Sequence, residues 1–139
     1  MATLAPPAEA AAKPSITRGR ILVVDDEPVM GAVLRRIFGR AHDVTVVDHA
    51  KAALAAIDGG AQFDVVLCDV VMPDLSGPQL YEAVRQRHPC LLDRFVFITG
   101  GALHEKSSRF LASISNPVLS KPFELHAVRE LVRRLVSRA

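Results

Sequence analysis

The sequence predicts an α/β fold in which helices cover both faces of a five-stranded parallel sheet. Four short apolar runs, rich in Val and Ile, are typical of strands that are buried on both faces. These runs span residues 21–24, 65–68, 95–98 and 117–120. Segments with apolar residues at helical spacing separate them, and this alternation of strand and helix is the pattern of a parallel sheet with crossover helices.

The first helix follows the first strand. It is expected to open near Pro28 and to end near Gly39, because Met30, Val33, Leu34 and Ile37 recur at helical spacing between them. A second strand is predicted over residues 44–47, and a second helix over residues 51–57 ends at a pair of glycines. The first half of the chain therefore supplies two strand–helix units.

The second half repeats this order. After the third strand come a loop with Pro73 and Gly77 and a helix over residues 79–87, which Pro89 stops. A weaker helical pattern over residues 105–114 follows the fourth strand. The last helix carries an apolar stripe of Leu125, Val128, Leu131, Val132 and Leu135. Right-handed crossovers between these strands predict a doubly wound, flavodoxin-like sheet.

Residues 1–19 differ in composition from the rest of the chain. They are dominated by Ala and Pro, and Pro6, Pro7 and Pro14 interrupt any helix. We expect a disordered or semi-rigid tail or linker there, followed by one folded domain over residues 20–139. A chain of 139 residues has room for one core and not for a second domain.

Charge and composition exclude several classes of function. The net charge is only +2, and the Arg residues 129, 133, 134 and 138 fit a solvated face of the last helix better than a basic stripe for nucleic acid. The five histidines lack the short spacing of zinc ligands. We therefore expect neither direct nucleic-acid binding nor a zinc centre.

Cysteine usage and hydropathy bear on the compartment. Cys68 and Cys90 lack a paired spacing, and Cys68 falls in a predicted buried strand. The chain has no apolar run long enough to span a bilayer, and its start lacks the features of a signal peptide. These features predict a reduced, cytoplasmic protein whose domain makes no membrane contact.

Five polar residues stand at or just past the downstream ends of the apolar runs: Asp25, Asp26, Asp69, Thr99 and Lys121. The carboxyl edge of a parallel sheet is where such folds bind ligands. Three carboxylates, a hydroxyl and an ammonium on that edge predict a site for a cation and a phosphate group. Each residue also has a structural alternative, since an aspartate can cap a helix or a turn and a lysine can be exposed at a strand end.

The sequence blocks around these residues resemble the receiver domain of two-component response regulators. The blocks run from Ile21 to Pro28, from Cys68 to Pro73 with Gly77 beyond, over Thr99-Gly100, and over Lys121-Pro122-Phe123. They occur in the order of the family, and the resemblance covers about residues 20–138. A cis peptide bond between Lys121 and Pro122 is part of what the resemblance implies.

The resemblance implies a role for each residue. Asp69 is the expected nucleophile, which attacks a phosphoryl group in line and forms an acyl phosphate. Mg²⁺ is the expected cofactor, held by Asp69, by Asp26 directly, by Asp25 directly or through water, and by the backbone carbonyl of Val71. Lys121 and Thr99 are the expected partners of phosphoryl oxygens.

Two positions depart from the receiver pattern. An aromatic residue commonly lies three positions before the lysine and moves as the hydroxyl residue engages the phosphate, but this chain has Val118 there. The position two residues after the phosphoacceptor is the apolar Val71, which cannot orient water by a side-chain hydrogen bond. We expect an output that is either muted or carried by loop movement around Gly100 and Gly101.

The expected partner is a histidine kinase or a histidine phosphotransfer protein, and the domain would catalyse only its own phosphotransfer and dephosphorylation. The signal would pass by protein contact to an unknown downstream protein, with Phe110, Leu111 or the last helix as possible contact residues. The chain fits a stand-alone regulator or the receiver of a hybrid histidine kinase. Two alternatives stay open: an aspartate-nucleophile phosphatase of the haloacid dehalogenase type, whose motif order differs, and an interaction module that is not phosphorylated.

Overall fold

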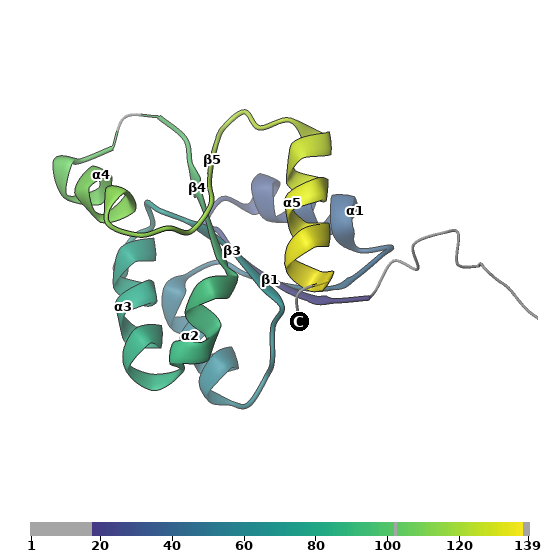
Figure 1. Cartoon of the computed structure of the whole chain (residues 1–139), viewed down its shortest axis with the longest axis horizontal. Helices are drawn as coiled ribbons and strands as arrows, with labels where there is room; N and C mark the ends of the chain where they lie inside the picture. Colours follow the sequence, from purple (N-terminus) through teal and green to yellow (C-terminus); the bar gives the residue numbers. More distant parts are fainter. Residues whose placement is uncertain (1–17, 102, 138–139) are drawn as a thin grey trace, which may run out of the picture.

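A computed structural model describes residues 18–101 and 103–137, and it has the predicted doubly wound α/β architecture (Figure 1). The five strands are parallel and lie in the order β2-β1-β3-β4-β5. They are β1 Arg20–Val24, β2 Asp43–Val47, β3 Val65–Asp69, β4 Phe95–Thr99 and β5 Val118–Ser120. The helices are α1 Pro28–Phe38, α2 Ala50–Asp58, α3 Gly77–Arg87, α4 Glu105–Ala112 and α5 Leu125–Ser137, with a 3-10 helix, η2, over Pro89–Arg94.

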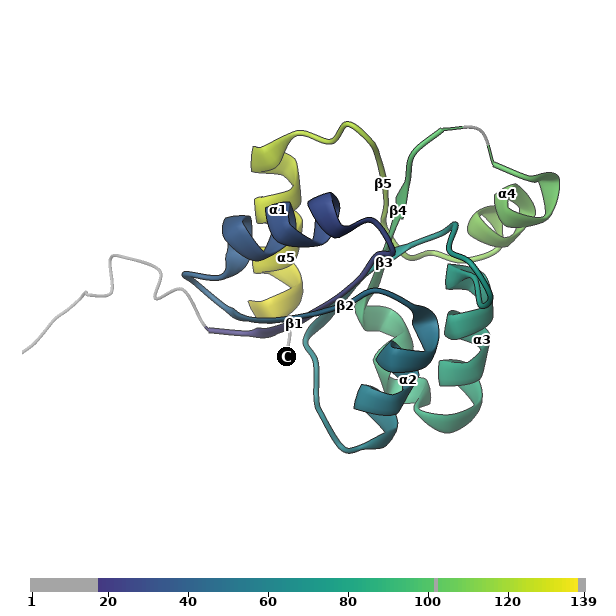
Figure 2. The same cartoon turned by 180° about the vertical axis from the view of Figure 1, so that it is seen from behind.

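Helices cover both faces of the sheet, as Figures 1 and 2 show from opposite sides. Alternate residues of the central strands point to opposite faces, so each face has its own apolar core. The core on the α1 and α5 side contains Ile21, Val23, Leu67, Ile98 and Val132. The core on the α2 and α3 side contains Leu22, Val24, Cys68, Phe97 and Leu80, and α4 packs partly against it. The predicted fold class is confirmed.

An aromatic cluster fills the second core below the end of β4. The ring of Tyr81 on α3 lies 5.3–5.6 Å, between centroids, from the rings of Phe95, Phe97 and Phe110. The hydroxyl of Tyr81 donates a 3.0 Å hydrogen bond to Oδ1 of Asn116, whose amide nitrogen donates to the carbonyls of Leu92 and Phe95. This network joins α3 and α4 to the β4 strand.

The structure corrects the predicted burial of the run over residues 117–120. This run forms the edge strand β5, which pairs only with β4, and Val118 is 41 % exposed rather than buried on both faces. A strand with one neighbour and little helical cover keeps part of its surface in water. Pro89 ends α3 as predicted, but the chain turns at once into η2, and α4 ends at Ala112 rather than at residue 114.

The predicted tail, residues 1–19, lies mostly outside the described residues. Arg18 and Gly19 are described, and both contact the domain before β1 begins. The Arg18 guanidinium binds Asp43 at 2.9 Å, and the N–H of Gly19 donates a 2.9 Å hydrogen bond to Nδ1 of His42.

Candidate metal and phosphate site

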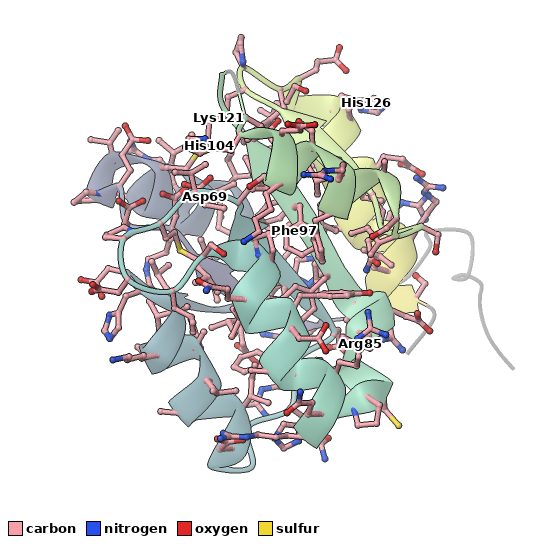
Figure 3. All side chains as sticks on the ribbon, turned by 90° about the vertical axis from the view of Figure 1, so that its left-hand side faces the viewer. Asp69, Arg85, Phe97, His104, Lys121 and His126 are labelled. Carbon is pink, nitrogen blue, oxygen red and sulfur yellow. The ribbon has the colours of Figure 1, made fainter. Side chains whose placement is uncertain are left out.

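The predicted polar residues lie together at the carboxyl edge of the sheet. Asp69 and Thr99 are the last residues of β3 and β4, and Lys121 directly follows β5. Figure 3 shows Asp69 and Lys121 close to one another above Phe97. An open hollow of about 700 Å³ is lined by Asp69 and Lys121 together with Glu27 and Gly100. Parallel pairing thus brings residues remote in sequence to one edge.

Three carboxylates form the centre of the site. One oxygen from each of Asp25, Asp26 and Asp69 lies within 4.8 Å of the others. Asp25 and Asp69 are buried, whereas Asp26 is exposed. The Oδ1 atom of Asp25 accepts a 2.9 Å hydrogen bond from the N–H of Glu27, but its Oδ2 atom has no hydrogen-bond partner among the described residues. A buried oxygen without a partner, beside two further carboxylates, suits a hard divalent cation.

The alternative that an aspartate caps α1 is wrong. The N-cap position of α1 is Glu27, and the helix has no side-chain hydrogen bond at its start. The hydrogen bond accepted by Asp25 comes from Glu27 itself, so it orders the loop between β1 and α1.

Burial and mutual repulsion change the acidity of the site. Burial, together with the nearby Asp25 carboxylate, raises the pKa of Asp69 to about 6, although Lys121 and the Val71 backbone oppose the shift. Burial is also the main cause that raises the pKa of Asp25. The folded protein therefore resists ionisation of these groups, and their negative charge destabilises it when no cation is bound.

The free energy of unfolding should consequently depend on pH, and Asp69→Asn should remove the part of this dependence that comes from Asp69. The folded-state pKa of Asp69 lies above its ordinary value of 3.8. The destabilisation caused by its negative charge is therefore absent below about pH 4 and complete above about pH 6. We expect Asp69→Asn to raise the free energy of unfolding by about 1–2 kcal/mol at pH 7 in EDTA, and by little at pH 4. Urea denaturation at both pH values measures this difference.

The control for this measurement is Asp48→Asn on the surface. The pKa of Asp48 is lowered by its hydrogen bond to His49, so that substitution should not stabilise the protein. Equal stabilities of wild type and Asp69→Asn at pH 7 would contradict the assigned cost of the buried charge.

Lys121 reaches across the site from β5. Its Nζ atom lies 3.6 Å from Oδ2 of Asp25 and 3.7 Å from Oε1 of Glu27, and its side chain is only 20 % exposed. These distances make ion pairs but not hydrogen bonds, which is consistent with the unpartnered Oδ2. The backbone N–H of Lys121 donates a 2.7 Å hydrogen bond to the carbonyl of Thr99. This bond fixes the backbone position from which the Lys121 side chain extends.

Two glycines make room for these groups. A Cβ atom on Gly100 would lie 3.0 Å from the Lys121 side chain, and one on Gly77 would lie 2.5 Å from the Asp69 carbonyl oxygen. Gly77 begins α3, and its N–H donates to the carbonyl of Val70. A capping box between Ser76 and Gln79 fixes that helix start. The end of β3 and the start of α3 can therefore lie in close contact.

Sequence reasoning did not assign Glu27 to the site, although it is the second carboxylate beside Lys121. Its position next to an acidic pair and before a helix-starting proline was the available signal. The predicted cis peptide bond between Lys121 and Pro122 is confirmed.

The two departures from the receiver pattern can be placed in the structure. Val118 lies opposite Phe97 in the β4–β5 register on the exposed edge. Val71, in the loop two residues after Asp69, is 58 % exposed. Gly101 has φ of 122°, a backbone conformation that favours glycine. Movement of the Gly100-Gly101 loop stays a prediction.

Comparison with known families decides the class of the domain. A sequence model of the response regulator receiver domain matches residues 21–133. The chain belongs to this family. The predicted resemblance, and with it the phosphoaccepting class of domain, is confirmed.

The chain is similar to part of longer curated proteins. The chain is 33 % identical to transcriptional regulatory protein TcrA of Mycobacterium tuberculosis over 86 % of its own length and 46 % of that protein. It is 29 % identical to sensor kinase CckA of Brucella abortus over 85 % of its own length and 12 % of that protein. The chain thus spans half or less of the length of these relatives.

Solved receiver domains share the fold. The receiver domain of Francisella response regulator 1452 is 26 % identical, with a TM-score of 0.73, and the match covers 87 % of this chain and 98 % of that one. The receiver domain of sensor histidine kinase PA1611 from Pseudomonas aeruginosa is 23 % identical, with a TM-score of 0.75 and coverage of 87 % and 99 %. That structure has a magnesium ion coordinated in its active-site cleft.

Features outside the site bear on the remaining expectations. Cys68 and Cys90 are both free thiols, and burial raises the pKa of the Cys68 thiol far above its ordinary value. Of the helices in the described part of the chain, none has both the length and the apolar character to cross a membrane.

Proposed function

We propose that Asp69 accepts a phosphoryl group from a histidine kinase or a histidine phosphotransfer protein, and that this step depends on Mg²⁺. The observation that carries the proposal is the cluster of Asp25, Asp26 and Asp69, with a buried Asp25 oxygen that lacks a hydrogen-bond partner among the described residues. In an interaction module that is not phosphorylated, these buried carboxylates would destabilise the fold without serving a function. The folded domain of the proposal spans residues 20–139.

The proposed ligands of the ion are carboxylate oxygens of Asp25, Asp26 and Asp69 and the backbone carbonyl of Val71. Their hard oxygen donors suit Mg²⁺, and the set is open enough to leave water on the ion. When bound, the ion neutralises the negative charge that would otherwise keep the nucleophile and the phosphoryl group apart. The magnesium in the PA1611 receiver domain, in a chain of the same fold, supports this assignment.

The transfer itself follows from the placement of three side chains. A carboxylate oxygen of Asp69 attacks phosphorus, the bond between phosphorus and the donor imidazole nitrogen breaks, and that nitrogen keeps the electron pair. Lys121, which lies beside Asp25, supplies a positive charge for one phosphoryl oxygen. The hydroxyl of Thr99, at the end of β4, donates to another. An Asp69 that is ionised at pH 7 suits a nucleophile.

The proposal extends to partners and location. The domain acts in the cytoplasm, signals to a downstream protein by protein contact, and binds neither nucleic acid nor membrane directly. The proposed contact surface is the α4, β5 and α5 side, although Phe110 and Leu111 pack partly against the core. Because Val118 replaces the usual aromatic residue, the signal would pass through the Gly100-Gly101 loop.

Incubation of the protein with a small phosphoryl donor such as acetyl phosphate tests the chemistry. We expect an increase in mass by one phosphoryl group in Mg²⁺ and none in EDTA. The adduct should be removed by hydroxylamine, which cleaves acyl phosphates. An adduct that resists hydroxylamine, or that forms equally well without a divalent ion, would contradict the proposal. The same assay with purified histidine kinases identifies the donor.

A further inference from the structure

A second pocket lies between the end of α1 and the middle of α5. The first turn of α1 borders the acidic site, and the helix of eleven residues carries the chain about 16 Å away from it. Figures 1 and 2 show α1 and α5 side by side on the same face of the sheet. The pocket has a volume of about 320 Å³, and its lining includes Ile37, Phe38, Arg40, His42, Arg129 and Arg133. No part of the phosphoacceptor chemistry uses these residues.

A buried histidine supplies a hydrogen-bond donor in this pocket. His42 is only 5 % exposed, and its Nδ1 accepts a 2.9 Å hydrogen bond from the N–H of Gly19. A ring nitrogen that accepts a bond carries no proton, so in the neutral ring the proton is on Nε2. Burial and the nearby Arg18 lower the pKa of His42, although Asp64 and Asp43 oppose the shift, and the lowered pKa favours this neutral form. Within residues 18–101 and 103–137, the Nε2 donor has no hydrogen-bond partner.

The arginines make the pocket positively charged. Arg133 is paired with Glu130, whereas Arg40 and Arg129 have no ion pair within the described part of the chain. The carbonyl of Phe38 at the end of α1 already accepts a hydrogen bond from the N–H of His42. The Arg40 guanidinium is therefore not needed as a donor to this carbonyl. Arg129 belongs to the predicted solvated face of the last helix, and together with Arg40 it borders this concave site.

We propose that this pocket binds a small organic anion. Its phosphate or carboxylate group is held by the Arg40 and Arg129 guanidinium groups and by the Nε2–H of His42. Guanidinium groups present planar pairs of donors that match both kinds of anion. Ile37 and Phe38 offer an apolar wall to the carbon part of the ligand. The volume is at the lower end of the range for small-molecule pockets, which excludes a large ligand. The proposal does not depend on phosphorylation of Asp69.

Nuclear magnetic resonance titration of the whole chain with phenyl phosphate, and separately with benzoate, tests this proposal. Divalent ions are removed beforehand with a chelating resin, so that the acidic site holds no divalent ion and repels both probes while no competing carboxylate is present in solution. We expect saturable shifts confined to the His42 ring nitrogens and the amides of residues 37–42 and 129–133. Stronger binding of phenyl phosphate identifies a phosphate ligand, and stronger binding of benzoate identifies a carboxylate ligand. Phenol, which lacks the anionic group, should produce no saturable shift.

Charge-removing variants complete the test. Arg40→Gln and Arg129→Gln should each weaken the preferred probe about tenfold or more, because each removes a charge-assisted hydrogen bond. Arg109→Gln on the exposed side of α4 makes the same change of net charge away from the pocket and should leave the affinity unchanged. Absence of saturable shifts with both probes would overturn the proposal. Equal weakening by all three substitutions would also overturn it, since it would indicate attraction to the net charge alone.

Discussion

The Asp69→Ala variant should accept no phosphoryl group, from a small donor or from a histidine kinase. Asp69 ends β3, and its carboxylate is the one proposed to bond to phosphorus. Loss of a nucleophile cannot be compensated by binding, so we expect a decrease to the background of the assay, a factor of at least about 10³. Intact-mass spectrometry after incubation with acetyl phosphate and Mg²⁺ measures the fraction of modified protein.

The matched control is Asp48→Ala, whose side chain is 80 % exposed and pairs only with His49 among the described residues. That variant should be phosphorylated as fast as the wild type. If Asp69→Ala were still modified at the wild-type rate, the phosphoacceptor would have to be another residue. Circular dichroism of both variants establishes that a loss of labelling does not come from unfolding.

The Asp25→Asn variant should bind Mg²⁺ much more weakly than the wild type. The unpartnered Oδ2 of Asp25 is the buried atom most in need of a cation, and the substitution removes its charge. We expect the dissociation constant to rise about tenfold to a hundredfold, with a corresponding need for more Mg²⁺ in phosphorylation. The chain contains no tryptophan, so isothermal titration calorimetry is the suitable measurement.

A second variant separates direct coordination from general attraction. Glu27→Gln removes the same charge two residues away, from a carboxylate that lies 3.7 Å from Lys121 and outside the acid cluster. It should weaken Mg²⁺ binding only about twofold to threefold, as expected for a partly screened neighbouring charge. Comparable losses in both variants would contradict a ligand role for Asp25.

Much of the site was predictable because it depends on strand order and strand ends. Asp25, Asp69 and Thr99 each stand where an apolar run stops, and parallel pairing brings such positions to the same edge. The resemblance to the family then predicted a distinct role for each residue. Glu27 was not predicted, because its contact with Lys121 crosses 94 positions of the chain. The local signal, an acidic residue beside an acidic pair and before a proline, does not record that contact.

Other features depend on the neighbours that the fold provides. The run at residues 117–120 was predicted to be buried like the central strands, yet β5 lies at an edge, so Val118 is exposed. The raised pKa of Asp69 comes from burial and from Asp25, which is 44 positions away in the sequence. The pocket at His42 needs the end of α1 beside α5, and the sequence showed only a basic helix face.

The sequence by itself determined the order of strands and helices, the family, and the residues at the strand ends. These properties follow from periodicity and motif spacing, which act between residues close together in the chain. Only the tertiary structure decided which strand is exposed, which carboxylates share one buried volume, and which donors lack partners. Burial and electrostatic interaction depend on distance in space, and the fold sets that distance between residues far apart in sequence.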